Sequence, residues 1–175
     1  MLSQTIAEVL GEHLNLELYS SYLYLSMAAY FDHEELPGFA HWMKVQVREE
    51  LDHVVRVYSY TNDRGARVAL MPIAGPPSQW KSPRHAFEDA LTHEQGTTAR
   101  VHRLVDQALR EVDYASHGFL QWFVAEQVEE EALIKRVLQN LRLIEGAAGG
   151  LFMIDQNLAT RVYKGPAGAA TTPTP

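Results

Sequence analysis

The placement of helix-breaking residues limits the fold of this chain more than any other feature of its sequence. Turn-forming residues gather in four clusters, at Pro37-Gly38, Asn62 to Gly65, Met71 to Ser82 and Gly146 to Gly150. Proline removes a backbone donor and glycine adds conformational freedom, so such clusters interrupt helices. Four long segments lie between them, and we predict a helix for each, over residues 4–33, 39–64, 83–111 and 114–145.

The lengths of the connections predict how these helices are arranged. Only a few residues join the first helix to the second and the third to the fourth, so each pair is expected to form an antiparallel hairpin. About 18 residues separate the second helix from the third. That length can span a bundle of about 40 Å at a rise of 1.5 Å per helical residue. The sequence therefore predicts an all-α, antiparallel four-helix bundle with one long crossover.

Local signals refine the helix ends and the chain that follows the bundle. Ser82-Pro83 is a typical helix start, whereas Ser3 and Thr5, the latter in a capping box with Glu8, compete at the first helix. Apolar residues at helical spacing predict a short fifth helix over 151–161 that packs on the bundle. We expect one domain over residues 1–163 and a flexible tail over 164–175.

Each predicted long helix carries an apolar stripe that is interrupted by side chains able to bind metal. Two of these side chains, Glu50 and His53, are spaced i and i+3 and therefore share one helix face. The interrupting residues are Glu17 in the first helix, Glu50 and His53 in the second, Glu94 in the third, and Gln127 and Glu130 in the fourth. Every long helix thus contributes at least one polar donor to the predicted core.

Four buried carboxylates need compensation, because burying an unpaired charge costs several kcal/mol. Their summed charge of -4 matches two divalent cations, and the four stripes contain no lysine or arginine. The chain has no cysteine, so any metal is bound through oxygen and imidazole, which suits iron or manganese. The alternative is a structural bundle that buries a hydrogen-bond network without metal.

The charge balance argues against two classes of partner. With 15 basic and 22 acidic residues the formal net charge is -7, which disfavours nonspecific binding to nucleic acid or anionic membranes. The first residues lack the features of a secretory signal, and no apolar run approaches the length of a membrane span. We therefore expect a cytoplasmic protein with neither partner.

Several motifs of this chain resemble those of bacterial non-haem ferritins. They are Asn15 to Ser21 (NLELYSS), Glu49 to His53 (EELDH), Phe119 to Phe123 (FLQWF) and Glu126 to Glu131. The resemblance implies an iron-storage subunit with ferroxidase activity, which oxidises Fe(II) to Fe(III) with O2 or H2O2. It also implies a homo-oligomeric shell of 24 subunits, with the short fifth helix near the four-fold axes.

The same resemblance implies roles for individual residues. One iron would be bound by Glu17, Glu50 and His53, with Gln127 beside them, and the second by Glu50, Glu94 and Glu130. Tyr24 matches a tyrosine next to the di-iron centre, where it would donate an electron or a hydrogen bond. The other interpretation of Tyr24 is an ordinary core tyrosine.

A third iron site is also implied, formed by Glu49, Glu126 and Glu129 together with Glu130. The first three are offset by one position from the primary ligands, about 100° around each helix, so a solvated acidic face is the alternative. No haem is expected, because Leu51 stands where the related bacterioferritins place a haem-ligating methionine.

A second candidate function would use the same metal ligands. It is a stand-alone di-iron or di-manganese oxidoreductase that stores nothing, and particle size and retained iron distinguish the two. The absence of cysteine disfavours a rubrerythrin-type peroxidase. A DNA-protecting mini-ferritin is disfavoured by the predicted fifth helix and by the lack of basic residues after Lys164.

Overall fold

Five helices and no strand form from the residues that the structure, a computed structural model, describes: 1–145 and 147–165. The helices are α1 (Gln4–His33), α2 (Pro37–Asp63), α3 (Pro83–Arg110), α4 (Tyr114–Leu143) and α5 (Gly150–Leu158). The all-α bundle and its short fifth helix are confirmed. Residues 166–175 of the predicted tail lie outside the described residues, as does Gly146 of the glycine cluster.

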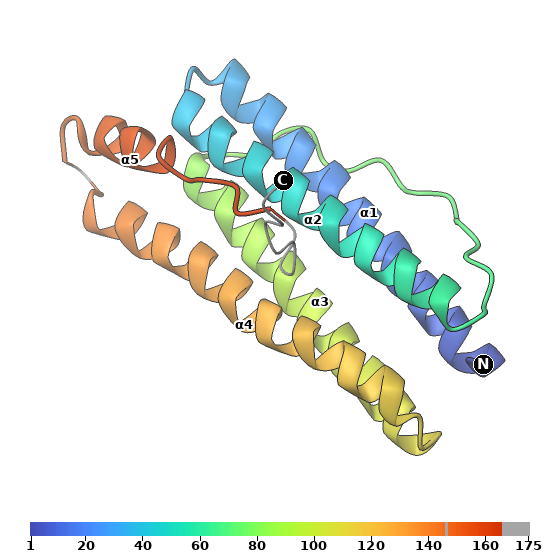
Figure 1. Ribbon diagram of the computed structural model, residues 1–175. Coiled ribbons are helices and arrows are strands. Elements are labelled where there is room, and N and C mark those ends of the chain that lie inside the picture. Colours follow the sequence, from blue (N-terminus) through green and yellow to red (C-terminus); the bar gives the residue numbers. More distant parts are fainter. Residues whose placement is uncertain (146, 166–175) are drawn as a thin grey trace, which may run out of the picture.

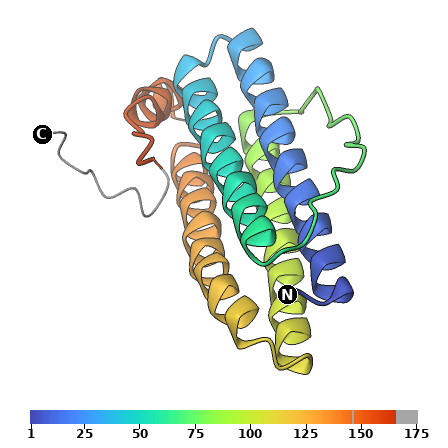
Figure 2. The same ribbon diagram turned by 45° about the vertical axis from the view of Figure 1, so that its right-hand side comes forward.

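The four long helices lie side by side, with α1 packed against both α2 and α3, and α3 against α4 (Figures 1 and 2). Short turns at residues 34–36 and 111–113 reverse the chain within each hairpin. The connection over residues 64–82 runs along α1 from one end of the bundle to the other. Its carbonyls at Pro72 and Pro77 accept hydrogen bonds from Asn15 (3.4 Å) and Ser26 (2.6 Å). The predicted long crossover is present.

Side-chain caps start three of the long helices. Ser3 Oγ accepts a hydrogen bond from the backbone N–H of Ile6 at 3.1 Å, so Ser3, and not Thr5, caps α1. The capping box predicted for Thr5 is therefore wrong. Ser82 caps α3 as predicted, accepting from the N–H of His85 at 3.1 Å, and Asp113 caps α4.

The start of α2 is capped by a residue from the far end of the chain. Leu36 makes no side-chain cap, but Asp155 Oδ1 on α5 accepts from the N–H groups of Gly38 (2.7 Å) and Phe39 (3.1 Å). A Cβ atom at Gly38 would lie 1.7 Å from the carbonyl oxygen of Asp155, so glycine permits the close approach. The helix begins at Pro37, two residues earlier than predicted, because proline fits the first turn and Asp155 satisfies the donors that follow.

The apolar core is divided into two clusters along the bundle. One cluster includes Phe31, Phe39 and Phe87 and is packed against α5 through Ile154. The other includes Leu10, Val57, Val101, Leu120 and Phe123. The predicted polar donors lie in the layer between them. Since both sides of this layer are closely packed apolar surface, its polar groups have little access to water.

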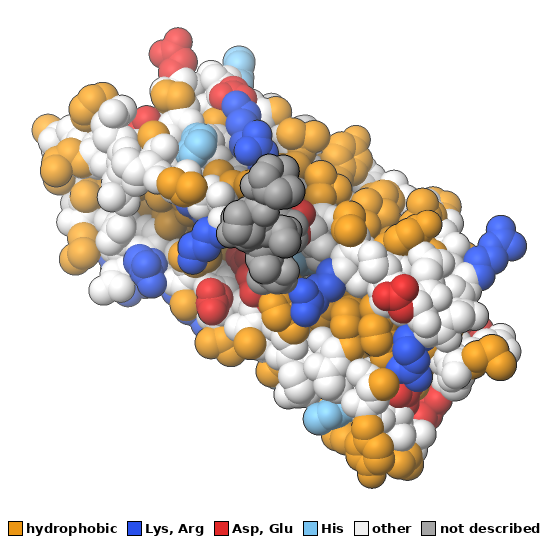
Figure 3. Space-filling view, in the orientation of Figure 1, with side chains coloured by type: hydrophobic (Ala, Val, Ile, Leu, Met, Phe, Trp, Pro, Cys, Tyr) orange, Lys and Arg blue, Asp and Glu red, His pale blue; other side chains and the backbone are white. Residues whose placement is uncertain are grey.

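Apolar side chains are also exposed on the outer face of the α1–α2 hairpin, and Figure 3 shows hydrophobic side chains gathered along α2. They are Tyr22, Leu25, Leu51, Val55 and Tyr58, each at least 43% exposed. None of the described helices combines the length and the apolar character needed to cross a membrane. Exposed apolar side chains gathered on one face are typical of a surface that contacts another protein.

Replacing Asp155 with alanine is expected to destabilise the docking of α5. Two buried N–H groups of α2 would lose their acceptor, which costs about 1–3 kcal/mol in the free energy of unfolding. Urea denaturation measures this loss. The matched control is Asp106→Ala on the exposed face of α3, for which a change below about 0.5 kcal/mol is expected. Equal effects of the two substitutions would contradict the capping role.

Candidate metal centre

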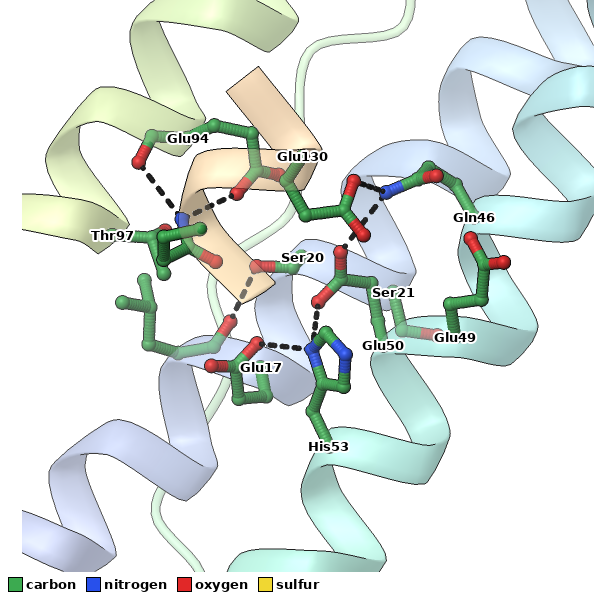
Figure 4. A network of polar contacts seen from close by, with 12 residues as sticks. Glu17, Ser20, Ser21, Gln46, Glu49, Glu50, His53, Glu94, Thr97 and Glu130 are labelled. Atoms are coloured by element: carbon green, nitrogen blue, oxygen red, sulfur yellow. Dashed lines mark hydrogen bonds and ion pairs between the residues drawn. The ribbon is translucent and has the colours of Figure 1, made fainter. Parts of the chain in front are cut away.

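Six donors that the sequence singled out meet in the polar layer between the two apolar clusters. Figure 4 labels Glu17, Glu50, His53, Glu94 and Glu130 among them. Each of the six is exposed by 4% or less, and together they come from all four long helices. They are Glu17 on α1, Glu50 and His53 on α2, Glu94 on α3, and Gln127 and Glu130 on α4. The buried side chains of the described residues include no lysine or arginine. The structure thus brings the carboxylates together without a lysine or arginine between them.

Glu17, Glu50 and His53 form a metal-binding geometry within this layer. His53 Nδ1 lies 3.3 Å from Glu50 Oε2 and 3.6 Å from Glu17 Oε2. One donor atom from each of the three residues lies within 4.8 Å of the others, a separation that a single ion can bridge. Neither oxygen of Glu17 receives a well-oriented hydrogen bond. Buried acceptors without donors are rare in folded proteins, and a bound cation would satisfy them.

Two amides hold the other carboxylates. Gln46 Nε2 donates to Glu130 Oε2 at 2.6 Å and to Glu50 Oε1 at 3.4 Å. Gln127 Nε2 donates to Glu94, at 3.1 Å to Oε2 and 3.2 Å to the backbone carbonyl. The structure therefore places Gln127 against Glu94. Gln46, a buried residue of α2 that was not among the predicted donors, links Glu50 to Glu130.

Tyr24 reaches the same layer from α1. Its hydroxyl donates a hydrogen bond to Glu94 Oε1, and the side chain is fully buried. Burial, followed by the nearby charges of Glu94, Glu50 and Glu130, raises the pKa of Tyr24 well above its ordinary value. The phenol therefore stays protonated and acts as a hydrogen-bond donor to Glu94.

Burial changes the protonation of the carboxylates. It raises the pKa of Glu50 to about 7, with a further contribution from Glu17. It also raises the pKa of Glu94 to about 7, assisted by Glu50, and raises the pKa of Glu130 well above its usual range. Without a cation the layer reduces its negative charge by taking up protons, because desolvation disfavours the charged form.

The same neighbours favour the charged form of His53. Burial disfavours its charged form, but hydrogen bonds and charge from Glu17 and Glu50 outweigh burial and raise the pKa of His53 well above its ordinary value. A proton on His53 therefore takes the place of a cation between the two carboxylates. A metal ion at this point would displace that proton, since metal binding requires the neutral imidazole.

His13 is the residue of this layer that sequence reasoning missed. It is 0% exposed, and its Nε2 lies 3.1 Å from Glu17 Oε1. Its ring packs edge-on against Phe123 with centroids 5.0 Å apart, and neither ring nitrogen makes a well-oriented hydrogen bond. Burial lowers the pKa of His13 to about 3, so the imidazole is neutral. The signal was present in the sequence, because His13 lies three residues after Leu10 and four before Glu17, on the buried face.

A second acidic group lies outside the core, next to the first. Glu49, Glu126 and Glu129 line a pocket of about 540 Å³, and His53 and Glu130 contribute to its lining. Donor atoms of His53, Glu126 and Glu130 lie within 4.8 Å of one another, so this group also has metal-binding geometry. His53 therefore belongs to both groups and joins the core layer to the outer pocket.

Comparisons with known proteins match this chain to one family and to individual relatives. The Ferritin-like domain family matches residues 7–144. A bacterial non-heme ferritin of Staphylococcus aureus is 36% identical over 163 residues, covering 93% of this chain and 98% of the relative. A probable bacterial non-heme ferritin-like protein of Haemophilus influenzae is 36% identical over 158 residues, covering 90% and 96%.

Among solved structures, an open-pore ferritin from the hyperthermophilic archaeon Archaeoglobus fulgidus superimposes with a TM-score of 0.91. It is 46% identical in sequence, and the match covers 93% of this chain and all of that one. An engineered closed form of the Archaeoglobus fulgidus ferritin also superimposes with a TM-score of 0.91. The fold and the sequence therefore point to the same family.

The stability of the metal-free protein is expected to fall as pH rises from 6.5 to about 8. In this range folded Glu50 and Glu94, with pKa values of about 7, retain protons that the unfolded chain, with values near 4.5, has released. His53, with its raised pKa, acts in the same direction. His13 has the opposite sign, but most of its contribution is already present at pH 6.5, the ordinary pKa of the unfolded imidazole. Thermal unfolding in the presence of chelator measures the slope.

The double variant Glu50→Gln, Glu94→Gln should flatten this slope, since neither side chain then titrates. The control is Glu8→Gln on the exposed part of α1, which should keep the wild-type slope. An unfolding midpoint that rises with pH over the same range in the metal-free wild type would contradict the assigned protonation.

Proposed function

This chain belongs to the ferritin family, and from that premise we propose that it is an iron-storage subunit with ferroxidase activity. It binds two Fe(II) ions in the buried carboxylate layer, oxidises them and delivers the ferric product to the interior of a multi-subunit shell. The observation that carries the proposal is the meeting of four buried glutamates from four helices, with no lysine or arginine among the buried described residues. Two divalent ions balance that charge.

The geometry supports a division of the donors between two ions. Glu17, Glu50 and His53, whose donor atoms lie within 4.8 Å of one another, would bind the first ion. The other buried carboxylates of the layer, Glu94 and Glu130, would bind the second ion together with Glu50. Glu50 suits the bridging position because one of its oxygens faces His53 and the other faces the Gln46 amide that also contacts Glu130. His13 would orient Glu17, and Tyr24 would orient Glu94.

The chemistry follows from these ligands. Each Fe(II) gives up one electron, and two electrons with two protons convert O2 to H2O2, or H2O2 to two water molecules. Hard, anionic oxygen ligands favour Fe(III) over Fe(II), so the carboxylates drive the oxidation forward. The protons that Glu50, Glu94 and His53 hold in the metal-free state leave when iron binds.

Storage requires assembly, and two surfaces support it. The exposed apolar face of the α1–α2 hairpin fits contact with a second copy of the chain. The α5 helix packs on α2 and α4 and also exposes Phe152 and Met153, at 67% and 72%. We propose a homo-oligomeric shell of 24 subunits in the cytoplasm, as the ferritin family implies.

Size-exclusion chromatography before and after aerobic addition of Fe(II) tests storage directly. The expected result is a particle far larger than the 19.8 kDa subunit, with iron co-eluting well beyond two ions per subunit. A small oligomer that turns over Fe(II) but retains no more than two ions per subunit would identify a stand-alone di-iron oxidoreductase instead.

Replacing the bridging residue tests the oxidation step. Glu50→Ala should slow the initial oxidation of Fe(II) by more than about tenfold, because losing even an outer-shell partner of a metal ligand typically costs 10–100-fold. Stopped-flow absorbance of Fe(III) formation measures the rate. The exposed Glu8→Ala on α1 serves as control and should retain the wild-type rate. An unchanged rate in Glu50→Ala shells of normal size would place the reaction elsewhere.

A further inference from the structure

The segment that follows α5 turns back and lies along α2. The carbonyl of Arg161 accepts a hydrogen bond from His41 Nε2 at 2.8 Å. Its guanidinium stacks over the ring of Trp42, 4.2 Å from the centroid, and donates to the Trp42 carbonyl at 3.4 Å. Arg161 is therefore fixed in place by both its backbone and its side chain.

A second anchor lies two residues further on. The hydroxyl of Tyr163 donates a hydrogen bond to Asp52, and the guanidinium of Arg48 lies over the Tyr163 ring, 5.8 Å from its centroid. All the side chains that receive the segment belong to α2. The segment is thus a defined strap, residues 161–164, held along one helix.

The strap places a positive charge in the outer acidic pocket. Arg161 Nη2 forms an ion pair with Glu49, and the two side chains are only 13% and 21% exposed. Arg161 and Lys164 line the pocket together with Glu126 and Glu129. Figure 3 shows acidic and basic side chains next to one another in the middle of this face.

The Arg161 guanidinium and a metal ion in the outer pocket would compete for the Glu49 carboxylate. The guanidinium donates directly to its carboxylate, and a charge-assisted bond of this type is about twice as strong as a neutral one. A metal ion bound at Glu49 would weaken this bond by repelling the guanidinium, which is largely shielded from water. Leaving a buried charge without its partner is costly, so the Arg161–Glu49 pair opposes the binding of an ion at Glu49.

We propose that Arg161 limits each subunit to two tightly bound metal ions. Its guanidinium pairs with the Glu49 carboxylate and competes with a third ion in the outer pocket. The inference rests on the proposed function, since it presumes metal binding at the neighbouring carboxylates. It predicts that the core layer fills first and that the outer pocket fills only weakly while Arg161 is in place.

Isothermal titration of the metal-free, full-length, assembled protein with Zn(II) tests the proposal. Wild type is expected to bind two ions per subunit tightly. Arg161→Gln should gain a third site at least about tenfold tighter than any outer-pocket site of wild type, about 1.4 kcal/mol. Arg161→Lys keeps the charge but loses the planar fork, so its third site should be intermediate.

Two variants locate the effect. Arg136→Gln makes the same change of charge at an exposed position on α4 and should bind Zn(II) as wild type does. The double variant Glu49→Gln, Arg161→Gln should lose the third site again and keep the two core ions. That pattern would assign the third ion to the carboxylate that Arg161 releases.

The proposal is overturned if Arg161→Gln gains no third site, if wild type already binds a third ion equally tightly, or if Arg136→Gln reproduces the gain. Should Arg161→Gln fail to assemble, Arg161→Lys decides the question by the same comparison. The two core ions are counted separately. Their absence from every variant contradicts the proposed function, whereas the difference between Arg161 variants concerns the outer pocket alone.

Discussion

The fold depends on one constraint, which is that four long helices must bury four carboxylates in a layer that no buried lysine or arginine of the described residues enters. Two apolar clusters, one on each side, hold the helices close enough to keep water out of this layer. In the metal-free state protons, two amides and a tyrosine hydroxyl hold the carboxylates in place. The apolar clusters thus stabilise the fold, and the carboxylates between them bind protons or, in their place, cations.

The α2 helix connects the two metal-binding groups. Glu50 faces the core layer and Glu49, its neighbour in sequence, faces the outer pocket, while His53 contributes to both groups. Adjacent positions on a helix point about 100° apart, so a single turn of α2 supplies an inner and an outer site. An ion leaving the core on this side would therefore meet further carboxylates before reaching solvent.

Local patterns in the sequence predicted most of the fold and the six core donors, because helix periodicity and breaker positions depend only on nearby residues. The bounds of α1 were predicted to the residue, and those of α3 and α4 to within two. The contacts of Gln46 with Glu130, of Asp155 with α2, and of Arg161 with Glu49 were not foreseen. Each joins residues more than eighty positions apart, and no spacing rule covers such distances. His13 differs, since its periodicity placed it on the buried face.

Asp155 and the segment after it have a practical consequence for how this protein is handled. Because α5 is tied to the first turn of α2 and residues 161–164 follow the same helix to Glu49, a tag or cargo placed within this segment would disturb its contacts with the helix that supplies both metal groups. The amino end offers a safer attachment point, since its cap on Ser3 and its contact with Arg64 lie at the opposite end of the bundle from α5. Affinity handles and displayed peptides belong there.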